Sequence, residues 1–447
     1  MNKSKLKFGT STEPAPNLLS QLLGKLDSLD LEGSEFPLSL SVATPSVNVW
    51  EWLVANEGLP RVVWGDRDSA RTMGGVGVAD DISVEGKDSY SSAVELCRKT
   101  LNGDRRLRYF GGLAFDASAE WPVFGAGRFI IPRITLADGV MTLAVMDPAD
   151  IHQAKQDLQR IRFEFGDFPN SLPRLISKNY LPNRDGWDAR VREALSLIQN
   201  EALEKIVLSR QTNLQFESRL NPISLAHELS RTTHDCFVFC FNFGPESSFL
   251  GATPERLFYR HGQVLQSEVV AGTRMRGSNV EEDQNLEQDL LDSDKDQREH
   301  DIVRKSIRQK LHKFVEQLEV DSQASILKLA RKQHLRSNVL GMLKPDVDDG
   351  MLLSRLHPTP AVGGYPTENA LPEIARIEPF NRGWYAAPVG WIGSDSAHFA
   401  VAIRSGWAVA DRLSLFSGAG IVRGSRPEAE WEEVENKIQD FLSIFRD

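Results

Sequence analysis

The chain has 447 residues, of which 41% are hydrophobic and 26% are charged, as is ordinary for a soluble globular protein. Its formal net charge of −10 argues against a nucleic-acid-binding protein, because such proteins normally carry a basic surface. The sequence contains no run of about 18 apolar residues, so it predicts no membrane-spanning helix.

The cysteines and the N-terminal residues indicate the cellular compartment of the protein. Cys97, Cys236 and Cys240 form neither a metal-ligand pattern nor a disulfide framework, which favours a reducing compartment. The first residues, 1–17, lack the apolar stretch of a signal peptide. We therefore expect a cytoplasmic protein, with a plastid transit peptide as the alternative that the Lys and Ser content leaves open.

The N-terminal part of the chain, residues 1–180, predicts a β-rich half. Residues 1–35 are typical of a polar leader followed by a short helix. Short apolar runs then alternate with Gly and Asp turns, including a hairpin at 137–139, and a helix is expected around 147–165.

The segment LPNRDG, from residue 181, is typical of a linker, and residues 185–447 form the second half. This half begins with a helix and the strand KIVLSRQTNLQF, and residues 280–320 predict a long charged helical region. Three antiparallel strands are expected in WYAAPVGWIG, HFAVAIRSGWAVA and RLSLFSGAGIV. The last helix opens on a predicted capping box at 425–428. Strands and helices occur in clumps, so the fold class is α+β.

Two pairs of carboxylates stand three residues apart in predicted helices, Asp296 with Glu299 and Glu430 with Glu433. Residues at positions i and i+3 share one helical face, so two such faces brought together would form an oxygen-rich site. Such a site suits Mg²⁺, which takes one or two carboxylates, keeps several waters and accepts substrate oxygens. Solvated helix faces are the alternative, and they are the commoner case for an arbitrary pair.

Three charged residues and one turn are further candidates. Lys205 begins the strand KIVLSR and Glu255 follows a strand end; the ordinary alternative is a solvated lysine and a glutamate paired with Arg256. Arg404 interrupts an apolar strand, where a guanidinium seldom lacks an anionic partner. That partner is either an internal carboxylate or a ligand carboxylate. The glycine-rich turn 417–420 lets backbone N–H groups approach an anion, although such turns are common.

Nine segments carry a family resemblance: KIVLSR, GATPERLF, VVAGTRMRG, KDQREHDIV, QHL, LHPTPAVGGYP, FNRGWYAAPVGWIG, FAVAIRSG and SGAGIVRGSRPEAEWEEVENK. In this order they resemble the chorismate-utilising enzymes, which include isochorismate and salicylate synthases and the chorismate-binding subunits of anthranilate and aminodeoxychorismate synthases. The segments cover nearly all of residues 200–440, whereas the N-terminal half matches mainly through YFGGLAFD. The resemblance implies one large α+β unit of two packed β-sheets with helices outside, and an active site in the C-terminal half.

The resemblance also implies roles for single residues. Glu299 and Glu433 would bind Mg²⁺, with Asp296 and Glu430 behind them. The residues expected to hold the enolpyruvyl carboxylate of chorismate are Tyr385, Arg404, Gly418, Gly420 and Lys437. The residues expected around the ring and its carboxylate are Gly272, Thr273, His334, Ala361 and Val362.

Lys205 decides between the activities of this family. Members that add ammonia carry Gln at this position, and members that add water carry Lys. Water attacking the ring 2-position must lose a proton, which a neutral amine accepts and a glutamine cannot. A neutral lysine in turn requires a lowered pKa, through burial or a nearby cation. Glu255, on the opposite face of the ring, would protonate the departing 4-hydroxyl. The resemblance thus implies an isomerase that converts chorismate into isochorismate.

Several alternatives stay open. A salicylate synthase would go on to eliminate pyruvate, but such enzymes typically show a GxPK-like sequence where this chain has Gly-Tyr-Pro-Thr at 364–367. An ammonia-using subunit would need a glutaminase partner, and Lys205 argues against it. A non-catalytic chorismate-binding regulatory protein is the alternative of another class. We expect a monomer that serves menaquinone or phylloquinone synthesis, with siderophore synthesis as the other pathway.

Overall fold

The structure is a computed structural model that describes residues 16–44, 47–86, 90–116, 121–163, 168, 172–244, 247–329 and 332–445. The polar leader expected at the N-terminus lies outside these residues. The helices are α1 (Pro16–Asp27), α2 (Val49–Ala55), α3 (Tyr90–Leu101), α4 (Asp150–Arg160), α5 (Arg184–Gln199), α6 (Pro222–Thr232), α7 (Val280–Asp292), α8 (Asp294–Leu311), α9 (Asp349–Leu356), α10 (Thr367–Ile377), α11 (Pro427–Lys437) and α12 (Gln439–Ser443). Within the described residues, no helix is long and apolar enough to span a membrane.

The described strands form two antiparallel sheets, one of twelve strands and one of ten. The larger sheet has the order β1 (Leu38–Ala43), β8 (Val140–Val145), β7 (Ile134–Ala137), β3 (Thr72–Val76), β2 (Arg61–Gly65), β11 (Phe237–Gly244), β12 (Ser247–Thr253), β21 (Ser405–Val409), β22 (Arg412–Val422), β10 (Lys205–Phe216) and β18 (Gly364–Tyr365), with β9 (Leu175–Leu181) also beside β10. The smaller sheet has the order β15 (Val315–Val320), β17 (Lys332–Leu343), β14 (Val264–Met275), β13 (Arg256–His261), β20 (Ser396–Val401), β19 (Pro388–Ile392), β5 (Tyr109–Leu113), β6 (Gly127–Ile131) and β4 (Asp80–Val84), with β16 (Ser325–Lys328) also beside β17.

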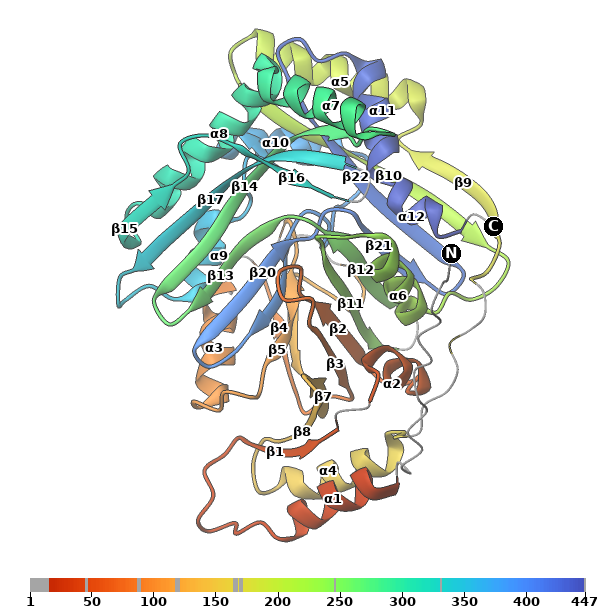
Figure 1. The fold of residues 1–447 in the computed structure, drawn as a ribbon, viewed down its shortest axis with the longest axis vertical. Coiled ribbons are helices and arrows are strands. Elements are labelled where there is room, and N and C mark those ends of the chain that lie inside the picture. Colours follow the sequence, from red (N-terminus) through yellow and green to blue (C-terminus); the bar gives the residue numbers. More distant parts are fainter. Residues whose placement is uncertain are drawn as a thin grey trace.

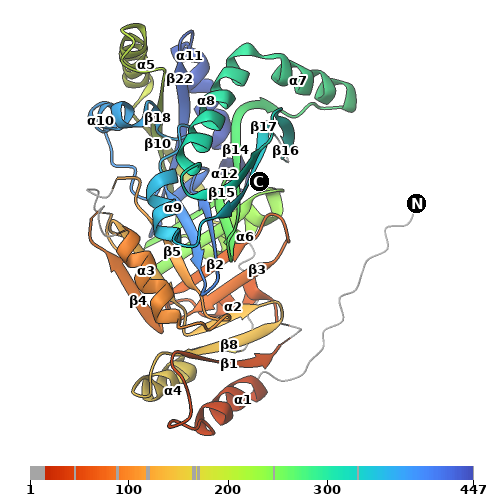
Figure 2. The same ribbon diagram turned by 90° about the vertical axis from the view of Figure 1, so that its left-hand side faces the viewer.

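The α+β fold class with two packed sheets is confirmed. Figure 1 shows α5, α7 and α11 at one end of the molecule and α1 and α4 at the other. Strands from both halves of the sequence pair within each sheet, and α3 of the N-terminal half packs against α9 of the C-terminal half (Figure 2). The division of the chain near residues 180–185 stays a prediction.

Strand β11 shows how the sheets are packed. Phe237, Phe239 and Phe241 belong to the core cluster that also contains Phe399 of the smaller sheet. The residues between them, such as Val238, belong to a second cluster that contains residues of the surrounding helices. Because successive side chains of a strand point to opposite faces, a strand covered on both faces has a continuous apolar sequence. The sequence CFVFCFNF has that pattern.

The segment 398–410, expected to be one strand, forms two strands in different sheets. β20 ends at Val401 in the smaller sheet, and β21 begins at Ser405 in the larger one. Arg404 lies in the connection with φ of 49°, a left-handed conformation that residues other than glycine rarely adopt. The prediction was wrong because apolar residues continue through the connection, so periodicity does not mark where the chain changes sheet.

Two expected helix boundaries also differ. The region 280–320 is not one helix but two, followed by strand β15. The break between the helices lies at Ser293, which caps α8 by accepting a hydrogen bond from the N–H group of Asp296. The expected capping box is wrong: the N-cap of α11 is Arg426, which makes no capping hydrogen bond. Pro427 takes the first helical position, which its fixed φ and missing N–H group favour, and this moves the cap one residue beyond Ser425.

A buried ion pair joins β13 to α9. Arg260 donates to Asp349 with a separation of 2.8 Å between Nη2 and Oδ2, and the two residues are 2% and 0% exposed. Asp349→Ala should lower the free energy of unfolding by about 3–5 kcal/mol, because it leaves a buried guanidinium without its carboxylate. Denaturant unfolding measures this loss. The control is Asp27→Ala, which removes an exposed pair with Lys155 and should cost below about 1 kcal/mol; equal losses in the two variants would contradict the prediction.

Candidate active site

Two connections between the sheets lie side by side and place two of the predicted site residues. The chain passes from β12 to β13 through Glu255, and from β20 to β21 through Arg404. β12 pairs with β21 and β13 pairs with β20, so the connections form one ribbon that crosses both sheets. The Val401 N–H group donates to the Glu255 carbonyl (3.0 Å), and the Ala252 N–H group donates to the Arg404 carbonyl (3.1 Å). Glu255 and Arg404 therefore share one bend.

A cavity of about 330 Å³ opens at this bend. It is lined by thirteen of the predicted site residues: Glu255, Gly272, Thr273, Asp296, Glu299, His334, Ala361, Val362, Tyr385, Arg404, Gly418, Glu433 and Lys437. The other three, Lys205, Gly420 and Glu430, are not among the described residues that line it. A larger cavity of about 1080 Å³ lies beside α9 and α10, but it holds none of the predicted residues. The convergence of acids and bases identifies the smaller cavity as the candidate site.

Glu255 carries the most informative pKa in the cavity. The residue is 5% exposed. Burial, the larger cause, and the neighbouring carboxylate of Glu268 together raise the pKa of Glu255 to about 8. Lys205, Lys437 and Arg404 oppose this increase without cancelling it. At neutral pH Glu255 is therefore a protonated acid, which is the form a proton donor needs.

Lys205 is fully buried at the start of β10 and pairs with Glu299 of α8, with 2.7 Å between Nζ and Oε1. Burial would raise the pKa of Glu299, but Lys205, Lys437 and Lys295 together hold it below its ordinary value. Gly420 of β22 makes room for the pair, since a Cβ there would lie 2.8 Å from Glu299 Oε1 and 2.9 Å from Lys205 Cε. Lys205 thus reaches the site through Glu299, which lines the cavity.

Helices α8 and α11 bring the predicted carboxylate pairs to the same site, each matched by a cation. Glu433 accepts from Lys437 (2.6 Å), and Glu430 accepts from Lys295 (3.3 Å). Glu430 is 1% exposed, and its second oxygen, Oε2, is buried without a hydrogen-bond partner among the residues that the structure describes. Asp296 is held by Ser293 Oγ at 2.6 Å. Within the described part of the chain, no group of three or more His, Cys, Asp or Glu side chains could hold a metal ion as arranged.

His334 of β17 and Arg404 form a second polar unit. The Arg404 guanidinium donates to His334 Nε2 (2.8 Å), so the histidine is neutral and carries its proton on Nδ1, which faces the Gly272 carbonyl (3.1 Å). Burial and the charge of Arg404 hold the pKa of His334 well below its usual value. Gly272 has φ of 76° at a register shift in β14, a position suited to glycine. Asp440 Oδ2 lies 3.8 Å from Arg404 Nη1, so Arg404 has an internal carboxylate partner and also lines the cavity.

The remaining predicted residues complete the wall. Lys437 donates to the Gly418 carbonyl (2.8 Å), and a Cβ at Gly418 would lie 3.0 Å from the Tyr385 hydroxyl oxygen. Both contacts place the glycine backbone against the cavity. Ala361 and Val362, from the loop before β18, line it with apolar surface.

Lys295 and Arg274 also line the cavity, and the sequence reasoning missed both. Arg274 Nη2 lies 2.9 Å from Asp296 Oδ2. The signal for Lys295 was its spacing of four residues from Glu299, which places both on one helical face. Arg274 had no comparable signal, because it reaches the site only through the pairing of β14 with the sheet.

The sequence model of the chorismate-binding enzymes matches residues 25–446. The chain belongs to this family. It is 33% identical to isochorismate synthase 2, chloroplastic, of Arabidopsis thaliana, over 96% of this chain and 85% of that protein. It is 32% identical to the isochorismate synthase MenF of Bacillus subtilis, over 86% of this chain and 87% of that protein. Among solved structures, the menaquinone-specific isochorismate synthase MenF of Escherichia coli aligns with a TM-score of 0.85 and 28% identity, covering 97% of this chain and 100% of that one.

The space left by Gly420 gives a test of the Lys205–Glu299 pair. In Gly420→Ala the added methyl group should displace one or both side chains and lower kcat/KM by roughly tenfold to a hundredfold, because catalytic groups tolerate little misplacement. Circular dichroism and melting temperature should stay close to those of the wild type. The control is Gly24→Ala in α1, where a Cβ meets nothing within 4 Å. Unchanged kcat/KM in Gly420→Ala would show that the close packing has no catalytic role.

The buried carboxyl of Glu255 also makes stability depend on pH. Its pKa of about 8 lies above the reference value of 4.5, so the folded chain keeps a proton that the unfolded chain releases between these values. This group alone should lower the free energy of unfolding as pH rises across that interval, by at most about 5 kcal/mol. Glu255→Gln does not titrate and should gain in melting temperature relative to the wild type between about pH 5 and about pH 8. A difference that stays constant with pH would disprove this.

Proposed function

We propose that the protein is an isochorismate synthase that converts chorismate into isochorismate. The observation that carries the proposal is that the buried, protonated Glu255 lines the same cavity as Glu299, the ion-pair partner of Lys205. The named relatives, two of them above 30% identity, support the same activity. The similarity to the menaquinone-specific enzyme supports a role in quinone synthesis.

The cavity offers separate groups for the two carboxylates of chorismate. Arg404 and Lys437 supply positive charge for the enolpyruvyl carboxylate, and the backbone at Gly418 and the hydroxyl of Tyr385 border the same part of the wall. Gly272 also lines the cavity, and the ring carboxylate is expected beside it. Local cations are necessary here, because the chain as a whole is negative and repels an anionic substrate.

The reaction needs one proton acceptor and one proton donor. As the water oxygen forms its bond to the ring 2-position, Lys205 Nζ, released from Glu299 and in its neutral form, takes the proton that the water loses. The hydroxyl at the 4-position leaves as water with the proton of Glu255. Lys205 ends the cycle with one proton more and Glu255 with one fewer, so a proton must return to Glu255 before the next turnover.

We also propose that Mg²⁺ is the cofactor, held by Glu299 and Glu433 with Asp296 and Glu430 behind them. Hard carboxylate oxygens are the ligands this cation prefers, and one or two direct protein ligands suffice. The buried Glu430 Oε2 has no hydrogen-bond partner in the described part of the chain. Burial and Glu433 raise the pKa of Glu430, so positive charge is favoured here. When bound, Mg²⁺ supplies charge that neutralises the ring carboxylate.

We further infer that the enzyme works as a monomer in the cytoplasm, without a glutaminase subunit. Cys97, Cys236 and Cys240 are free, buried thiols, which suits a reducing compartment. Lys205 replaces the glutamine of ammonia-using members, so an ammonia supply has no role in this reaction.

Incubation with chorismate and Mg²⁺ should yield isochorismate without pyruvate, and EDTA should stop turnover until Mg²⁺ is restored. Lys205→Ala and Glu255→Ala should each lower kcat by about 100-fold or more, because each removes a proton-transfer group. Chorismate should still bind both variants in isothermal titration calorimetry. The exposed Lys25→Ala serves as the control for loss of a lysine.

Each other outcome assigns a different function. Pyruvate with salicylate would identify a salicylate synthase, and anthranilate formed only with ammonia would identify an ammonia-using subunit. Binding of chorismate to the wild type without conversion would identify a regulatory protein.

A further inference from the structure

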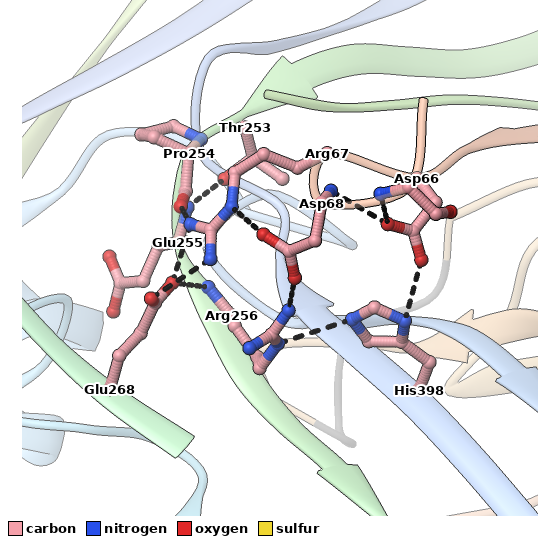
Figure 3. Close-up of polar contacts among 10 residues, drawn as sticks. Asp66, Arg67, Asp68, Thr253, Pro254, Glu255, Arg256, Glu268 and His398 are labelled. Atoms are coloured by element: carbon pink, nitrogen blue, oxygen red, sulfur yellow. Dashed lines mark hydrogen bonds and ion pairs between the residues drawn. The ribbon is translucent and has the colours of Figure 1, made fainter. Parts of the chain in front are cut away.

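The turn between β2 and β3 contacts the segment that carries Glu255, which is far from it in the sequence. Arg67 of this turn forms a bidentate pair with Glu268 of β14, with Nη1–Oε1 and Nη2–Oε2 distances of 2.7 and 3.0 Å (Figure 3). The side chains are only 4% and 2% exposed. A bidentate arginine–carboxylate pair fixes both direction and distance, so the two groups form a rigid unit.

This pair holds the peptide groups on either side of Glu255. Arg67 Nη1 also donates to the carbonyl of Pro254, and the N–H group of Arg256 donates to Glu268 Oε1 (2.8 Å). The carbonyl before Glu255 and the amide after it are thus bonded to the same ion pair.

The peptide groups of Glu255 itself are fixed as well. Its N–H group donates to Thr253 Oγ1 (3.2 Å), and its carbonyl accepts from the N–H group of Val401 (3.0 Å). The carboxyl group, by contrast, makes no hydrogen bond within the described part of the chain, and Figure 3 shows it pointing away from Arg67. Its orientation therefore depends on the backbone.

A surrounding network holds Arg67 in place. Asp68 accepts a hydrogen bond from Arg67 Nε (3.0 Å) and also pairs with Arg256. Arg256 in turn contacts His398, with 3.4 Å between Arg256 Nε and His398 Nε2. The guanidinium of Arg67 stacks over the ring of Phe237, 4.7 Å from its centroid. The N-terminal half thereby contributes a fixed element to the site of the C-terminal half.

We propose that Arg67 and Glu268 are positioning residues that orient Glu255 for proton delivery. The inference rests on the proposed function, in which Glu255 is the acid. Neither residue is among the described residues that line the cavity, so both act through the peptide groups of 254–256. A change at either one should lower kcat and leave KM nearly unaltered.

The charges around Glu255 add a second, independent readout. Glu268 of β14 is the neighbouring acid, and Lys205, Lys437 and Arg404 face Glu255 from β10, α11 and the sheet connection. Glu268→Gln removes the negative neighbour and leaves the cations, so the pKa of Glu255 should fall. Activity requires protonated Glu255, so the alkaline limb of the kcat/KM profile should move to lower pH.

The experiment compares Arg67→Met, Arg67→Lys, Glu268→Gln and the double variant Arg67→Met/Glu268→Gln with the wild type, using chorismate turnover. Arg67→Met should lower kcat by roughly tenfold to a hundredfold with little change in KM. Arg67→Lys keeps the charge and should recover part of this loss. The alkaline limb should shift down by about half a pH unit or more in Glu268→Gln. The matched control is Arg71→Met, in the same turn, which removes only an exposed pair with Asp138.

The results separate this inference from the proposed function. If the wild type makes isochorismate but Arg67→Met behaves like Arg71→Met, or the limb of Glu268→Gln does not move, the positioning role is overturned and the function stands. If the wild type does not make isochorismate, the function itself fails. If Arg67→Met does not fold, the double variant decides, because it removes both buried charges together; wild-type kcat in that variant overturns the inference.

Discussion

Lys205 and Glu299 meet at 2.7 Å in a buried position, and this contact illustrates the constraint under which the whole site is built. A carboxylate or ammonium group taken out of water costs several kcal/mol unless an opposite charge compensates it. The acids of α8 and α11 accordingly each face a basic side chain, as Glu433 faces Lys437 and Glu430 faces Lys295. By this argument, the proposed Mg²⁺ and an anionic substrate would preserve the balance if they entered together, whereas either one alone would disturb it.

The same constraint explains why the site lies where the chain changes sheet. Inside a regular sheet, the backbone polar groups are paired with neighbouring strands and side chains alternate between covered faces. At the paired connections that hold Glu255 and Arg404, two backbone hydrogen bonds continue but the regular register is broken, and both side chains line the cavity. The left-handed conformation of Arg404 belongs to this bend.

The sequence allowed the fold class and most of the cavity wall to be predicted, because both follow from local patterns and family segments. The strand KIVLSRQTNLQF was predicted as β10, Lys205–Phe216, with its ends correct. The crossing at Arg404 could not be predicted, because hydrophobic periodicity registers burial and is the same in either sheet. Lys295 and Arg274 were missed for a related reason: their roles depend on which acids the tertiary structure brings to them. The metal-binding role of the carboxylates stays a prediction.

Glu255 is held through its backbone, whereas Lys205 is held through its side chain. A carboxyl group oriented by a cationic partner would have its pKa lowered and would lose the proton it must donate. Glu255 therefore has to be oriented through its backbone, with burial and a neighbouring acid keeping it protonated. Lys205 is instead fixed by a side-chain partner, Glu299, and this contact has to be released before the amine can accept a proton. A proton donor of this kind requires a rigid peptide around it, which makes the distant Arg67–Glu268 pair as much a part of the site as the residues that line the cavity.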